Sequence, residues 1–98
     1  MKVSNKNARE YVERKQEFKG NNTFAEYIGN DYVVYSYGRH FPIYTFKNGK
    51  WYANSDKYSV STSKHQTQLC PNEHIFRFCN TELMKKLPYI SALESLTV

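Results

Sequence analysis

The dipeptide Asn48-Gly49 most narrowly limits how this chain can fold. A two-residue type I′ turn needs positive φ at both central positions, which Asn and Gly adopt at low cost. Residues 41–47 and 50–54 on either side are rich in aromatic and β-branched side chains, as strands are. The sequence therefore predicts an antiparallel hairpin, with Trp51 and Tyr52 on opposite faces of its second strand.

The segment before this hairpin predicts two further strands. Residues 23–28 and 32–37 have strand composition and flank a Gly-Asn-Asp turn at 29–31. Both faces of the segment 32–37 carry apolar side chains, so we expect it to be a central strand with one face against a helix.

An amphipathic helix is predicted over residues 4–19. Ser4 is a suitable N-cap, and Ala8, Tyr11, Val12, Lys15 and Phe18 recur at spacings of three and four. Gly20 is the expected stop, because glycine is the usual residue after a helix end.

The second half of the chain predicts shorter elements. Residues 58–60 are predicted to form a short strand or an extended segment, followed by a helix capped by Thr62 or Ser63 and ended by Pro71. Residues 73–78 alternate as a strand, and residues 80–87 predict a last helix that Pro88 breaks. The expected fold is α+β: an antiparallel four- to five-stranded β-meander packed with an N-terminal helix and short C-terminal helices, forming one domain over residues 1–98.

Several classes of protein are disfavoured by composition. The N-terminus has no apolar leader, and no run approaches the ~20 apolar residues of a membrane span, so we expect a cytoplasmic protein. Cys70 and Cys79 lack zinc-site spacing and are expected to be buried free thiols, with a disulfide between them as the alternative. The histidines and Asp56 show no clustered ligand spacing, and no glycine-rich nucleotide loop is present, so no metal or cofactor is expected.

Basic and aromatic side chains concentrate in the middle of the chain. The net charge is +5, and residues 37–70 hold five basic residues against one acid. Aromatic rings beside Lys and Arg serve base stacking and phosphate neutralisation, so this segment indicates a basic aromatic face that binds nucleic acid or a macromolecular partner. The alternative is that the rings form the core and the bases are solvated.

The hydroxyl-rich segment 59–65 adds a second indication. Small hydroxyls before Lys64 at a helix start suit an oxyanion, because free N–H groups, the helix dipole and an ammonium converge there. Ordinary N-capping is the alternative. His40 and His65 with Lys64 would be the minimum set for a metal-independent ribonuclease, one imidazole acting as base and the other as acid. We expect binding rather than catalysis, because nothing in the sequence brings the two rings together.

Residues 35–65 also carry a family resemblance. A Tyr-Ser-Tyr…Pro strand, a hairpin, and the segment Lys-Tyr-Ser-Val-Ser-Thr-Ser-Lys-His resemble a small uncharacterised domain of bacteriophage and mobile-element proteins. Ser61 departs from the pattern, which has Thr there. The resemblance covers about a third of the chain and implies a phage or mobile-element origin without implying an activity.

The leading hypothesis is a phage accessory or host-takeover protein that binds nucleic acid or a host nucleoprotein complex. Anti-defence inhibition, such as anti-CRISPR activity, falls within this class. The alternatives are a pure protein–protein inhibitor and the ribonuclease. Homodimer formation through an edge strand is a further option. The expected binding residues are Tyr35, Tyr37, Arg39, His40, Lys50, Lys57, Tyr58, Ser59, Thr62, Ser63, Lys64 and His65.

Overall fold

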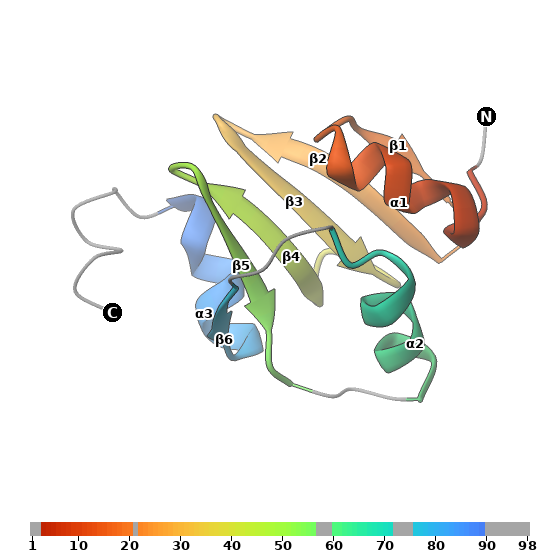
Figure 1. Ribbon diagram of the computed structural model, residues 1–98. Coiled ribbons are helices and arrows are strands. Elements are labelled where there is room, and N and C mark those ends of the chain that lie inside the picture. The colour runs from red at the N-terminus through yellow and green to blue at the C-terminus, as the bar shows by residue number, and fades with distance from the viewer. Residues whose placement is uncertain (1–2, 21, 57–59, 72–75, 90–98) are drawn as a thin grey trace.

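The computed structural model describes residues 3–20, 22–56, 60–71 and 76–89, and it has the predicted α+β class (Figure 1). One six-stranded sheet runs in the order β1-β2-β3-β4-β5-β6. The helical elements are α1 (Asn5–Glu13), α2 (Val60–Gln68), α3 (Thr81–Lys86) and the 3-10 turn η1 (Leu87–Tyr89). The strands are β1 (Phe18–Lys19), β2 (Thr23–Ile28), β3 (Asp31–Ser36), β4 (Pro42–Lys47), β5 (Lys50–Asn54) and β6 (Arg77–Cys79).

The meander predicted from the turn residues is confirmed. Strands β1 to β5 pair antiparallel in chain order. Asn48 and Gly49 have φ values of 54° and 76°, as the type I′ turn requires. Strand β3 is central and buried along its whole length. Strand β6 was not expected to run parallel, but it lies parallel to β5 because the connection through α2 returns the chain to the same end of the sheet.

The N-terminal helix is shorter than its apolar pattern predicts. Ser4 caps α1 by accepting a hydrogen bond from the Asn7 amide, but the helix ends at Glu13 instead of reaching residue 19. Lys15 takes the left-handed conformation, with φ 55°, that Gly20 was expected to supply. Phe18 then lies in β1 opposite Ala25. The prediction was wrong because Phe18 fits the apolar spacing of a helix and is equally suited to a buried position in a strand, which is where it lies.

The segment after β5 also differs from expectation. Helix α2 begins at Val60, so Thr62 and Ser63 lie inside the helix and cannot cap it. The predicted strand 58–60 is contradicted at Val60, and its first two residues lie outside the described part. Residues 73–75 of the predicted strand 73–78 also lie outside it. The last helix is confirmed, with Asn80 as its N-cap.

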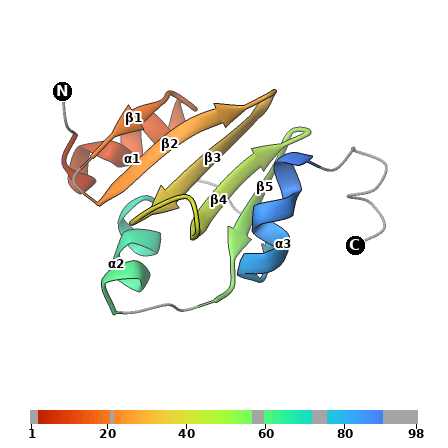
Figure 2. The same cartoon turned by 180° about the vertical axis from the view of Figure 1, so that it is seen from behind.

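The sheet has two unlike faces. The covered face packs against α1 and α2, and its core includes Val12, Tyr32, Tyr44, Trp51 and Leu69. The open face packs against α3 only over β4 and β5, as the view from behind shows (Figure 2). On this face no helix of the described residues lies over β2 and β3, and their side chains line a groove.

Candidate functional site

The tyrosines of the covered face hold helices on the sheet. The Tyr32 hydroxyl donates to the Gln16 carbonyl just beyond α1 at 2.7 Å, and the Tyr44 hydroxyl donates to the Gln66 carbonyl in α2. Trp51 meets both Tyr rings edge-on. Burial raises the pKa of Tyr44. These rings therefore belong to the core, and the expected binding face cannot consist of the meander aromatics as a group.

The turn between β3 and β4 presents a different tyrosine. Tyr37 has φ 67°, and its backbone N–H donates to the Asn22 carbonyl at 2.7 Å. Its side chain is 49% exposed, and its ring lies 5.3 Å from that of His65. A large residue with positive φ is uncommon and costs conformational energy. The fold thus holds an aromatic ring at the surface against a backbone preference.

His65 packs against this turn from α2. It is 5% exposed, and its Nδ1 lies 2.8 Å from the Ser36 hydroxyl oxygen, which joins α2 to the end of β3. Burial, with a smaller effect of Lys64, lowers the pKa of His65. His40 is exposed in the β3–β4 turn. The two imidazoles therefore occupy unlike environments.

Arg39 links the turn to the open face. Its guanidinium donates two hydrogen bonds of 2.8 Å to the Glu26 carboxylate. It also lies 5.4 Å from the centre of the Phe24 ring, which stacks on Tyr35 at 4.8 Å. The hydrogen bond from Arg39 is the main reason that the pKa of Glu26 is lowered. A guanidinium has five N–H groups, so three remain for a ligand.

Strand β1 adds residues that the sequence prediction missed. Lys19 pairs with Phe24 in the sheet, and the two line a small hollow of about 130 Å³ with Asn22 and Tyr37. No carboxylate of the described residues pairs with Lys19. It was missed because residues 18–19 were assigned to a helix, and no local signal places Lys19 beside the later turn. We define the turn site as Lys19, Phe24, Tyr37 and Arg39, which share the hollow or the Phe24 ring, and we add Lys64 because it precedes His65, whose ring lies 5.3 Å from that of Tyr37.

The remaining predicted residues do not gather at the turn site. Lys50 lies at the β4–β5 turn, at the opposite end of the antiparallel strands, and Tyr35 is buried on the open face. Lys47, counted in the basic segment, is buried in an ion pair with Asp31 at 2.8 Å. Thr62 and Ser63 lie within α2, beside Lys64 in the sequence. Lys57, Tyr58 and Ser59 lie outside the described residues.

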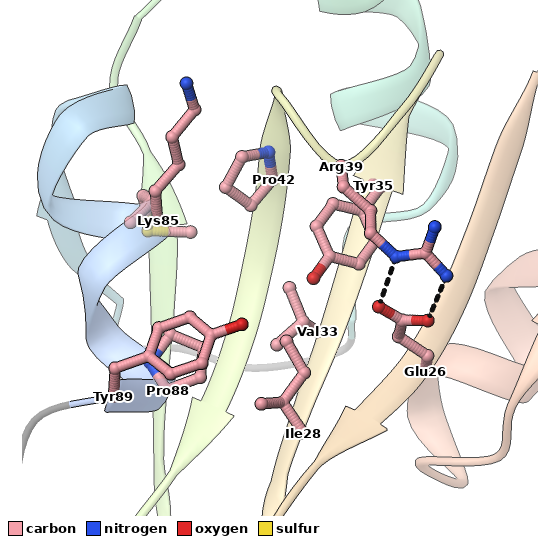
Figure 3. A pocket seen from close by; sticks show the side chains of 10 residues that line it. Glu26, Ile28, Val33, Tyr35, Arg39, Pro42, Lys85, Pro88 and Tyr89 are labelled. Atoms are coloured by element: carbon pink, nitrogen blue, oxygen red, sulfur yellow. Dashed lines mark hydrogen bonds and ion pairs between the residues drawn. The ribbon is translucent and has the colours of Figure 1, made fainter.

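The groove on the open face is the second candidate. It has a volume of about 300 Å³ and lies between strands β2 to β4 and the elements α3 and η1. Figure 3 shows Val33, Pro42 and Pro88 around its apolar part, with the Arg39–Glu26 pair on one side and Lys85 on the other. Tyr89, 74% exposed, forms part of the rim. The groove therefore has an apolar middle and charged side chains along its two edges.

Other kinds of site are not seen in the described ranges. Among those residues, no three His, Cys, Asp or Glu side chains cluster as metal ligands, and no helix is long and apolar enough to span a bilayer. Cys70 and Cys79 are free thiols, but both are half-buried, whereas full burial was expected.

Comparison of this chain with known proteins finds no similar protein. No family model matches this chain, and no match was found among curated proteins or solved structures. The resemblance of residues 35–65 to a phage domain therefore stays a prediction.

Proposed function

We propose that the protein is a binding protein that contacts single-stranded nucleic acid through the turn site. The observation that carries the proposal is Tyr37, whose ring is half-exposed at positive φ and lines the same hollow as Lys19. An exposed ring stacks on a base of any sequence, and nearby Lys and Arg neutralise phosphates.

The charges of the turn site favour a polyanion. Lys19 and Lys64 are exposed, and no carboxylate of the described residues pairs with either. Arg39 is tied to Glu26 but keeps N–H groups free. The setting we propose is that of a phage accessory protein that occupies host nucleic acid or a nucleoprotein complex; the resemblance of residues 35–65 supports only the phage or mobile-element origin.

We do not propose the ribonuclease. The hypothesis that His40 and His65 act as acid and base requires both imidazoles within hydrogen-bond reach of one phosphate. His65 is 5% exposed with one ring nitrogen beside the Ser36 hydroxyl, so it has little access to a substrate.

Fluorescence anisotropy with labelled single-stranded RNA and DNA tests the proposal. Tyr37→Gly removes the ring while suiting the positive φ, so we expect an affinity loss of about tenfold without loss of stability. Lys64→Ala should reduce the slope of log affinity against log salt by about 0.7, because one phosphate contact is lost. Lys86→Ala, on the exposed side of α3, is the matched charge control and should leave the slope nearly unchanged.

Two results would contradict the proposal. One is that wild-type protein binds neither oligonucleotide at low salt. The other is that Lys86→Ala weakens binding as much as Lys64→Ala does, because the interaction would then depend on net charge and not on the turn site.

A further inference from the structure

We propose that the groove on the open face binds an acidic, apolar peptide segment of a partner protein. The groove shares Arg39 with the turn site, but the proposal does not depend on nucleic-acid binding. It rests on the shape, the apolar lining and the unbalanced charge of the groove.

The apolar lining comes from both layers of the fold. Val33 and Pro42 from the sheet and Met84 from α3 form its floor and are themselves buried, while the half-buried Ile28 and Pro88 supply apolar surface that solvent reaches. Within the described part of the chain, no helix lies over β2 and β3 on this face (Figure 2). A ligand that removes this apolar surface from water lowers the free energy of the complex.

Tyr89 gives the rim an aromatic contact. Its side chain is 74% exposed although it lines an apolar groove. Figure 3 shows its ring beside Pro88, with the hydroxyl toward Val33. Exposed tyrosines next to apolar pockets are common centres of binding energy in protein interfaces.

The charge of the groove selects an acidic partner. Glu26 is already neutralised by two hydrogen bonds from Arg39 on the same side. On the other side Lys85 is exposed, and no carboxylate of the described residues pairs with it. The groove therefore carries about one uncompensated positive charge, which a carboxylate beside the apolar surface would complement.

The size of the groove limits the ligand. A volume of about 300 Å³ is at the lower end of the range for small-molecule pockets. It accommodates one or two apolar side chains rather than a large cofactor. A short peptide with an acidic residue beside a Leu or Phe has the size, charge and apolar surface that the groove requires.

Amide chemical-shift mapping with two capped peptides tests this inference. The probes are acetyl-Asp-Leu-Phe-amide and acetyl-Lys-Leu-Phe-amide, each titrated into the full ¹⁵N-labelled chain without nucleic acid. The acidic peptide should shift the amides of Val33, Met84, Lys85 and Tyr89. It should bind about threefold more tightly than the basic peptide, as one exposed ion pair allows.

Charge reversal in α3 supplies the matched control. Lys85→Glu should invert the preference between the two peptides. Lys86→Glu makes the same change one residue later, where the side chain pairs with Glu82 instead of lining the groove, and it should keep the wild-type preference. A preference that Lys85→Glu leaves unchanged would overturn the inference, and so would the absence of shifts at the groove.

The chain itself offers one competing ligand. Residues 90–98, ISALESLTV, follow Tyr89 and are apolar with a single acid. A full-length variant with Leu93→Asp and Leu96→Asp separates the two occupants. If that variant binds the acidic peptide more tightly than wild type does, the chain's own C-terminal residues occupy the groove and the partner proposal is overturned; unchanged binding supports it.

Discussion

On the covered face, Tyr32 and Tyr44 place their rings in the core and donate their hydroxyls to backbone carbonyls in or beside α1 and α2. On the open face, Tyr35 lies under Phe24 and Arg39 at one side of the groove, and Tyr89 stays at the rim. The same residue type therefore has a structural role on one face and lines a candidate site on the other. Tyrosines occur on both faces of the sheet, so the composition of the strands does not distinguish the two roles. What distinguishes them is whether helices cover the face.

The largest expected effect is a difference in the free energy of unfolding between a substitution on the covered face and one at the rim of the open face. Trp51 is 5% exposed and packs against three aromatic rings, so Trp51→Ala should lower the free energy of unfolding by about 4 kcal/mol. Tyr89→Ala on the rim should change it by less than about 0.5 kcal/mol. Guanidinium unfolding of both variants measures the difference. Similar losses in the two would mean that the open face is also part of the core.

The next effect concerns the buried charges of the open face. Lys47 and Asp31 form an ion pair of 2.8 Å with side-chain exposures of 7% and 10%. Asp31→Ala leaves the ammonium buried without a partner and should cost about 3 kcal/mol in urea unfolding. Replacing both residues, Asp31→Leu with Lys47→Met, should recover most of that loss. A cost below about 1 kcal/mol for the single change would show that the pair is solvated.

The smallest expected effect is a pH dependence on the covered side. The folded-state pKa of His65 lies below its ordinary value of 6.5, mainly because of burial, so folding favours the neutral ring. The stabilisation is complete above pH 6.5 and is lost as the pH falls through the folded-state pKa. Between about pH 7 and about pH 5, wild-type protein should therefore lose more stability than His65→Gln. Equal losses in thermal melts of the two proteins would contradict a buried neutral His65.

The parts of the fold that were predicted correctly have local signals. Asn48-Gly49 and Gly29 mark tight turns between strands of alternating or apolar pattern, so β2 to β5 follow from short stretches of sequence. Ser4 and Asn80 likewise cap helices through contacts within three residues.

The parts that were missed depend on contacts far apart in the sequence. Lys15 ends α1 in a conformation usual for glycine, with nothing in its side chain to indicate it. The pairing of β6 with β5 depends on the connection through α2. The hydrogen bonds between Arg39 and Glu26, thirteen residues apart, arise only when β2 and β3 pair. Tyr37 and His65 were both expected in the site. The burial of His65 was not predicted, because it depends on the packing of α2 against the end of β3.

The most direct test of the proposed function is amide chemical-shift mapping with a single-stranded oligonucleotide about 12 nucleotides long. The account predicts that the shifts concentrate at Lys19, Tyr37, Arg39 and Lys64, with the core amides of Tyr44 and Trp51 little changed. Shifts confined to the opposite end of the sheet around Lys50, or no shifts at low salt, would contradict it.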